Sequence, residues 1–203
     1  MLSTEFGRAF WEFVKLGQYE QQEKSSGEKQ FYRFQKPATD GYPFMLELFS
    51  RSQDGIEVPE DCHLTPIPVS DEVSSLSAIL LDEVYYAWIK AGKAEIDGIS
   101  IAGPECIIPL KAIAWLDLTD RKANGESIDS RAIKKHKNDI FRLSQIIDPE
   151  AIPEVPEKFK KDLNKFIKKS MEDESIDLKA LGIKGQSKED IFKYFEDSYK
   201  LNS

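Results

Sequence analysis

Residues 104–147 decide the fold of this chain, and they read PECIIPLKAIAWLDLTDRKANGESIDSRAIKKHKNDIFRLSQII. Apolar side chains recur in this stretch at helical spacing, which predicts two long helices. The first should cover 104–122 or 109–122, since proline is tolerated in the first turn of a helix. The second should cover 130–147, with a glycine in the link between the two.

The chain continues as helix beyond this pair. A proline-containing hinge at 149–156 precedes helices predicted at 156–171 and 188–200. Ser187 and Asp190 make a capping signal for the last helix. A serine before a helix and an acid three residues later can satisfy each other's free backbone N–H groups.

The preceding part of the chain, residues 1–103, mixes helices and strands. A helix is expected over 4–16, and aromatic-rich strands at 31–34 and 44–49 should pair antiparallel. Further predicted elements are a buried strand at 76–81, a helix at 84–91 and a strand at 98–101, with 51–74 irregular. Strands early in the chain and helices over 104–203 predict an α+β fold.

The composition indicates a folded, acidic protein without a zinc site or a membrane span. The chain has 203 residues, 40% of them hydrophobic, and a net charge of -8, so any anion site must be a local basic island. Two cysteines and two histidines are too few for a structural zinc site to be expected. The N-terminus does not read as a signal peptide, and no stretch approaches the ~20 apolar residues that span a bilayer. We therefore expect a cytoplasmic protein with no membrane partner.

Glu47 is a charged residue on a predicted strand whose same face carries Met45 and Phe49. A carboxylate in that position either lies at a sheet edge or in an ion pair, or it lines a cleft and helps to hold a hard divalent cation. One carboxylate cannot hold Mg²⁺ alone, because Mg²⁺ sites combine carboxylates with water and phosphate oxygens. Both interpretations stay open from the sequence.

A basic island lies at 121–142, where seven basic residues outnumber three acidic ones. It is either a solvated helix face or a phosphate-binding wall, in which lysine acts as a point charge and arginine as a planar fork. Helical geometry places His136 and Lys137 beside the apolar stripe of the second long helix. The other side of that helix carries Lys135, Asp139 and Arg142.

Lys111 interrupts an otherwise apolar run at 106–118 in the first long helix. Lysine is seldom buried without a partner. Its side chain either extends past Trp115 toward solvent or faces a phosphate or a carboxylate in a cleft.

Three stretches stand out for their order and spacing, namely Pro109-Leu110-Lys111-Ala112-Ile113-Ala114, Arg121-Lys122, and Lys137-Asn138-Asp139-Ile140 with Leu143. Together they resemble the C-terminal signature of the AbiEii toxin branch of the nucleotidyltransferases. The strand 44–49 occupies the place of the third metal-site carboxylate of that family, which makes Glu47 its counterpart. The likeness covers residues 30–147 and implies a partial nucleotidyltransferase-like mixed sheet followed by a helical region.

The defining motif of that family, a Gly-Ser followed by Asp-x-Asp or Asp-x-Glu, is not found in this sequence. Ser25-Ser26-Gly27 has no fitting carboxylate pair after it, and Glu95-Ile96-Asp97 has no Gly-Ser before it. Arg142 stands where relatives often carry a second aspartate. The chain resembles the family from the first helix after the motif onward, as a sequence that starts late or as a degenerate relative.

The intact family transfers a nucleotide from a triphosphate to an acceptor hydroxyl, using Mg²⁺. The resemblance implies that Lys111 and Lys137 face phosphate, that Asp139 pairs with Lys137, and that Glu47 is the residual metal ligand. This gives the candidate catalytic residues Glu47, Lys111, Lys137 and Asp139, and the candidate phosphate-binding residues Arg121, Lys122 and Lys135. It also implies a nucleoside triphosphate as ligand and an antitoxin protein as partner. We expect Glu47 to face Lys111 or Lys137 across a cleft, because an unpaired charge beside an apolar face is costly.

A non-catalytic protein-interaction module is the alternative function. The aromatic first helix or the C-terminal helices would then bind a protein partner. Trp11 lies about 100° from Phe10 around the helix 4–16 and has less obvious cover. We therefore expect self-association through the first helix.

We expect the 203-residue chain to transfer no nucleotide to RNA or protein with any nucleoside triphosphate and Mg²⁺. The reason is that two of the three metal carboxylates of the family are absent from the sequence, and two-metal transfer depends on them. A transfer assay with labelled triphosphates measures this. Robust metal-dependent turnover would contradict it and would point to a carboxylate pair elsewhere in the chain.

Overall fold

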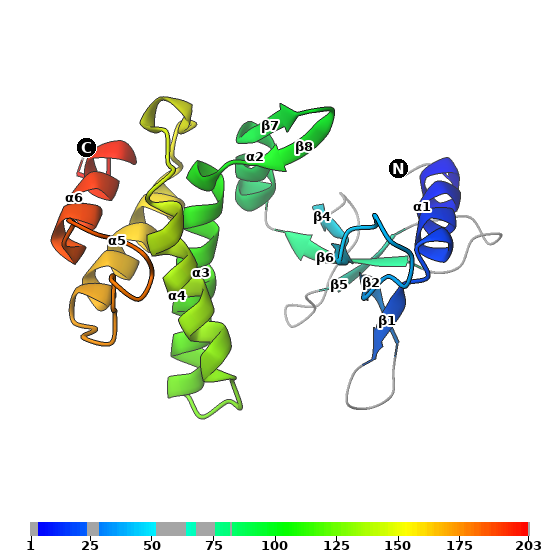
Figure 1. Ribbon diagram of the computed structural model, residues 1–203, viewed down its shortest axis with the longest axis horizontal. Helices are drawn as coiled ribbons and strands as arrows, with labels where there is room; N and C mark the ends of the chain where they lie inside the picture. The colour runs from blue at the N-terminus through cyan, green and yellow to red at the C-terminus, as the bar shows by residue number, and fades with distance from the viewer. Residues whose placement is uncertain (1–3, 24–28, 52–63, 68–75, 82, 203) are drawn as a thin grey trace. The chain divides into compact units, whose positions relative to one another are not determined.

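The computed structural model describes the chain apart from residues 1–3, 24–28, 52–63, 68–75, 82 and 203. The chain has an α+β fold and divides into two compact units, Met1–Tyr86 and Ala87–Ser203 (Figure 1). The boundary lies within helix α2, Glu83–Ala91. It falls earlier than residue 103, after which the sequence places the change from mixed to helical structure.

Two small sheets follow helix α1 (Thr4–Leu16) in the described part of the first unit. The first sheet consists of β1 (Glu20–Glu23), β2 (Lys29–Gln35) and β3 (Met45–Glu47), each antiparallel to the next. The second has β6 (Leu76–Leu81) in the middle, parallel to β4 (Phe49–Arg51) and antiparallel to β5 (Leu64–Ile67). Pro66 lies in the outer strand β5, where proline is tolerated because one edge needs no ladder hydrogen bond.

The predicted antiparallel pairing of the two aromatic-rich strands is confirmed, with Arg33 of β2 opposite Glu47 of β3. The single strand predicted at 44–49 is wrong, because β3 ends at Glu47 and Phe49 begins β4 in the other sheet. Strand β5 also lies within 51–74, which was expected to be irregular. Both β4 and β5 pair with β6. Strand β5 directly precedes β6 in the chain, whereas β4 lies further away in sequence, so no local pattern shows the pairing of β4.

Helix α1 packs on the first sheet around Phe34, which is fully buried, and Val14 of α1 is buried beside it. Trp11 contacts Phe34 edge-on, with ring centroids 5.5 Å apart, and Phe10 does the same at 5.4 Å. Trp11 was expected to have less obvious cover than Phe10, but both rings contact the same core residue and both are partly buried. Exposed apolar residues of α1 include Phe6, Phe13 and Leu16. Self-association through α1 stays a prediction that now rests on these side chains.

A tight hairpin follows α2 in the second unit. Strands β7 (Lys93–Ile96) and β8 (Ile99–Ala102) pair antiparallel around Asp97 and Gly98, whose φ angles are 51° and 76°. Positive φ at both central residues is the geometry of a type I′ turn, for which Asp-Gly is a preferred sequence. The strand predicted at 98–101 is confirmed as β8, whereas β7 was not assigned from the sequence although Asp-Gly signals it.

Four helices complete the second unit, as predicted from the helical spacing. They are α3 (Pro104–Ala123), α4 (Ser130–Leu143), α5 (Glu157–Met171) and α6 (Lys188–Ser198), with a 3-10 turn at Pro149–Ala151 (Figure 1). Helix α4 ends at Leu143 and not at 147. Ser144 is its C-cap residue, and the Ser144 hydroxyl donates to the Phe141 carbonyl at 2.7 Å. The capping signal of Ser187 and Asp190 is confirmed as a complete capping box at α6.

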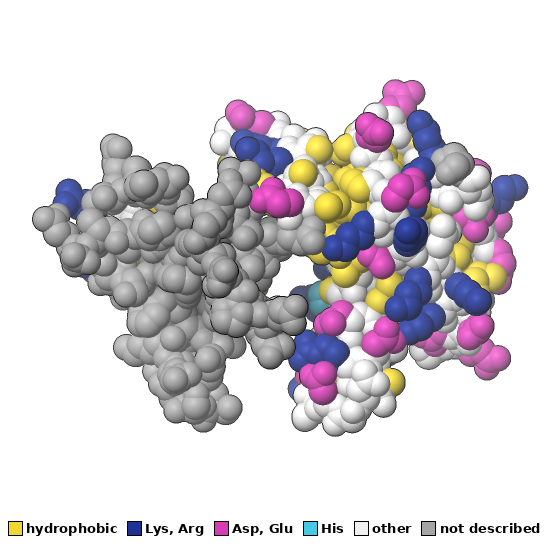
Figure 2. Space-filling view, turned by 180° about the vertical axis from the view of Figure 1, so that it is seen from behind, with side chains coloured by type: hydrophobic (Ala, Val, Ile, Leu, Met, Phe, Trp, Pro, Cys, Tyr) yellow, Lys and Arg dark blue, Asp and Glu magenta, His cyan; other side chains and the backbone are white. Residues whose placement is uncertain are grey.

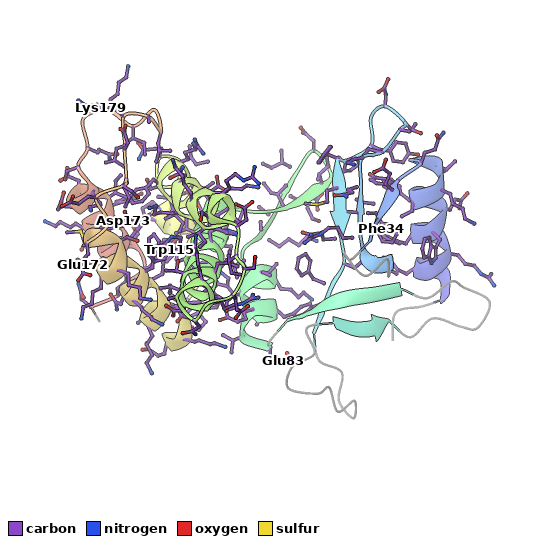
Figure 3. The ribbon with its side chains drawn as sticks, turned by 90° about the horizontal axis from the view of Figure 1, so that it is seen from below. Phe34, Glu83, Trp115, Glu172, Asp173 and Lys179 are labelled. Atoms are coloured by element: carbon purple, nitrogen blue, oxygen red, sulfur yellow. The ribbon has the colours of Figure 1, made fainter. Side chains whose placement is uncertain are left out.

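Aromatic side chains hold these helices together. Trp88 of α2 packs on Phe159 of α5 at 4.9 Å, and Trp115 of α3 (labelled in Figure 3) meets Phe166 of α5 edge-on at 5.3 Å. The Trp88 indole N–H also donates to the Cys106 carbonyl at 3.0 Å. Burial, and to a lesser extent the adjacent glutamate, raises the pKa of the Cys106 thiol to about 11. The Cys106 thiol is buried in the core, whereas Cys62 lies outside the described residues.

Candidate phosphate-binding face on α3 and α4

Lys111 and Asp139 meet across α3 and α4, which lie side by side and run in opposite directions (Figure 1). Lys111 Nζ donates to Asp139 Oδ2 at 2.7 Å, and the two side chains are 24% and 23% exposed. Further along the helix pair, Lys122 Nζ donates to Ser130 Oγ, which agrees with the antiparallel register. The Lys111–Asp139 pair is thus held at the edge of the seam, within reach of a ligand from solvent.

Two more side chains of α4 lie at this pair. Arg142 Nη1 is 3.7 Å from Asp139 Oδ1, and the arginine side chain is 54% exposed. His136 is half-buried, and its Nδ1 has no hydrogen-bond partner within the described parts of the chain. Burial lowers the pKa of His136, and the positive charge of Lys111 lowers it further. Asp139 opposes this shift, Lys135 adds to it, and the imidazole is neutral at neutral pH.

Lys137 faces away from this pair, toward the segment that follows α5. Its side chain is 7% exposed, and Nζ donates to a carboxylate oxygen of Asp173 and to Ser175 Oγ (3.0 Å). The expectation that Asp139 pairs with Lys137 is wrong, because residues two apart on a helix do not face each other. Lys137 instead ties α4 to the chain just beyond α5, where Figure 3 labels Glu172 and Asp173.

Hydrogen bonds stabilise the charged form of the Asp173 carboxylate, which is the form that pairs with Lys137. Burial acts to raise the pKa of Asp173, but hydrogen bonds from Lys137 and from the side chain and backbone of Ser175 lower it to about 2. The Ser175 backbone N–H donates to Asp173 Oδ1 at 2.9 Å. In addition, Lys188 of α6 donates to the Asp173 carbonyl at 3.1 Å. Cations from two helices therefore hold this segment in place.

Arg121 and Lys122 lie at the other end of α3, about 16 Å along the helix from Lys111. Arg121 donates to Glu126 Oε2 at 2.9 Å and lies 3.4 Å from Asp117 Oδ2. These carboxylates raise the pKa of Arg121, the hydrogen bond with Glu126 contributing most. The structure therefore separates these two predicted phosphate-binding residues from Lys111.

Lys135 is the predicted phosphate-binding residue that shares a face with the Lys111–Asp139 pair. Residues four apart on a helix are offset by about 40°, so Lys135 and Asp139 project from one side of α4. Lys135 is exposed to solvent. Figure 2 shows basic and acidic side chains interspersed over one face of the second unit. The sign of the surface charge alone therefore does not mark a phosphate-binding site there.

Glu47 belongs to the first unit and is paired with Arg33 on the neighbouring strand. Arg33 Nε donates to Glu47 Oε1 at 2.6 Å, and Nη2 lies 2.5 Å from the same oxygen. No cluster of three or more metal-ligating side chains occurs among the described residues. A carboxylate held by a guanidinium does not fit a Mg²⁺ site, because the metal would compete with Arg33 for that oxygen. Lys111 and Lys137, for which Glu47 was the expected counterpart, have carboxylate partners within the second unit.

Sequence reasoning missed the partner of Lys137 and the place of Arg142 beside Asp139. The acidic run at 172–174 was visible in the sequence, but its return to α4 depends on tertiary packing. The spacing of Asp139 and Arg142, three residues apart on a helix, could have indicated their contact.

Comparisons of the chain with protein-family models, with curated proteins and with solved structures gave no match. Among the residues that the structure describes, no helix combines the length and the apolar character needed to cross a membrane.

Proposed function

We propose that this chain is a nucleotidyltransferase-like protein of the AbiEii toxin type that binds a nucleoside triphosphate on the face formed by α3 and α4. Lys111 contacts a phosphate group, and Asp139 holds the lysine in position. The observation that supports this is the contact of Lys111 with Asp139. Both residues belong to the resembling stretches, they are 28 positions apart in sequence, and their charged atoms lie 2.7 Å apart.

The chemistry of the pair suits a phosphate ligand. A lysine ammonium has three donors, and Asp139 uses one of them, so further donors remain for phosphate oxygens. A lysine held by a carboxylate is also pre-positioned, as in the lysine–glutamate pair that protein kinases need in place for phosphoryl transfer. Lys137 is omitted from the site, because Asp173 and Ser175 already take its ammonium.

The proposal concerns binding and not transfer. Transfer in this family uses carboxylate-bound metal ions, and Glu47 is engaged by Arg33. The nucleotide therefore binds to the α3–α4 face without being transferred.

Calorimetric titration with each nucleoside triphosphate tests this proposal. We expect a saturable heat for the wild type and a loss of about tenfold or more in affinity for Lys111→Gln, which removes the charge and keeps most of the side-chain length.

Lys134→Gln is the matched control. Lys134 is exposed on α4, the helix of Asp139, and projects about 140° away from Asp139. Its substitution therefore removes one positive charge, as Lys111→Gln does, but from another side of the helix pair. Thermal unfolding of each variant shows whether the fold is retained. No saturable binding by the wild type, or equal affinities for Lys111→Gln and Lys134→Gln, would contradict the proposal.

A further inference from the structure

On the basis of the proposed function, we infer that Lys135 and Arg142 form, together with Lys111, a site for a ligand with two or more linked phosphates. Arg142 has no counterpart in the resembling stretches, where relatives often carry an aspartate instead. The inference therefore comes from where the structure places its guanidinium.

The three cations form a row along one side of α4. Lys135 and Arg142 are seven residues apart, which is about 10.5 Å along the helix and about 20° around it. Asp139 lies between them and brings Lys111 from α3 into the row through its 2.7 Å contact. A flexible, exposed side chain thus stands on each side of the fixed lysine.

The row is short of negative charge. Asp139 shares its two oxygens between Lys111 at 2.7 Å and Arg142 at 3.7 Å. Three cations against one carboxylate leave an excess of two positive charges. The neighbouring His136 is neutral at neutral pH and does not alter that excess.

Two other arginines of α3 and α4 have carboxylate partners of their own. Arg121 lies against both Asp117 and Glu126, and Arg131 lies against Asp129. The positive excess at the row contrasts with the net charge of the whole chain, which is -8. An anion that reaches the row gains attraction that solvent screening weakens with added salt.

The spacing selects the class of anion. A single phosphate that contacts Lys111 can also reach one flanking side chain, whereas Lys135 and Arg142 lie two helical turns apart. A chain of phosphates can contact Lys111 with one group and both flanks with the others. Arginine strengthens one end, because its planar fork binds two phosphate oxygens at once.

Titration with inorganic phosphate, pyrophosphate and tripolyphosphate at low ionic strength tests the inference. We expect affinity to rise in that order. Arg142→Gln and Lys135→Gln should each weaken tripolyphosphate binding by about five- to tenfold and should change phosphate binding little. Lys134→Gln, which lies off the row, should behave as the wild type.

The outcomes separate this inference from the proposed function. If tripolyphosphate binds through Arg142 but no nucleoside triphosphate binds, the site stands and the proposed function fails. If nucleoside triphosphates bind and neither Arg142→Gln nor Lys135→Gln lowers their affinity, the inference fails and the proposed function stands. Equal affinity for all three inorganic ligands also overturns it, and no binding of any anion overturns both.

Discussion

Asp173→Ala should destabilise the second unit by about 3 kcal/mol, as measured by the free energy of unfolding in urea. The substitution leaves the Lys137 ammonium inside the protein, where its side chain is 7% exposed, with Ser175 Oγ as its remaining partner. Removing one member of a buried ion pair is costly because the other charge stays desolvated.

Lys137→Met should cost less, about 1–2 kcal/mol, because the Asp173 side chain is 24% exposed and can regain water. The double variant Lys137→Met with Asp173→Ala should be more stable than Asp173→Ala alone, since no charge is then left buried. Equal stability of Asp173→Ala and the wild type would contradict a structural role for this pair.

The same pair should give stability a distinctive pH dependence. The pKa of Asp173 is lowered from 3.8 to about 2 in the folded protein. A lowered carboxyl pKa contributes stability above the unfolded value, and that contribution is lost as the pH falls through the folded value. The wild type should therefore lose about 2 kcal/mol from this pair as the pH falls from about 4 to about 2, and Asp173→Ala should lack that component.

Gly92→Ala should destabilise the second unit by about 2–3 kcal/mol, because the added methyl group has no room. A Cβ on Gly92 would overlap Cys106 Sγ and would lie 2.9 Å from Cys106 Cβ. The Gly92 backbone cannot move easily, since its N–H donates to the Trp88 carbonyl at 3.1 Å. The Cys106 side chain cannot move easily either, since it is buried beside the same tryptophan.

Cys106→Ala is the matching rescue for this substitution. It removes the Sγ atom that the new methyl group would overlap, so part of the lost stability should return in the double variant. The second unit should also retain near-native packing around Trp88, which its fluorescence can report. Full stability of Gly92→Ala alone would show that the contact between Gly92 and Cys106 is looser than described.

Patterns that span a few neighbouring residues predicted the helices, because helix formation depends on such short-range interactions. Helical spacing gave α1, α3 and α5, and the Ser187 capping signal gave the start of α6. The strand at 44–49 was mispredicted because Phe49 pairs with a strand far along the chain. Sequence pattern marks which residues prefer a strand, but it does not mark which sheet the strand joins.

The candidate site divides in the same way. Lys111 and Asp139 were singled out from the sequence, yet their contact with each other was not, because it depends on how α3 and α4 pack. Lys137 was expected to contact phosphate, but it pairs instead with the partly exposed carboxylate of Asp173 beyond α5. Residue type and helical face were readable from the sequence, whereas the partners of each charge were set by tertiary structure.

Nuclear magnetic resonance of the ¹⁵N-labelled chain during titration with a nucleoside triphosphate tests whether the nucleotide binds on the α3–α4 face. We expect the backbone amide shifts to concentrate around Lys111 on α3 and between Lys135 and Arg142 on α4. The amides around Lys137 and Asp173 beyond α5 should move less, because that ion pair is structural. Shifts confined to another region, or no saturable shift at all, would contradict the assignment of the α3–α4 face as the nucleotide site.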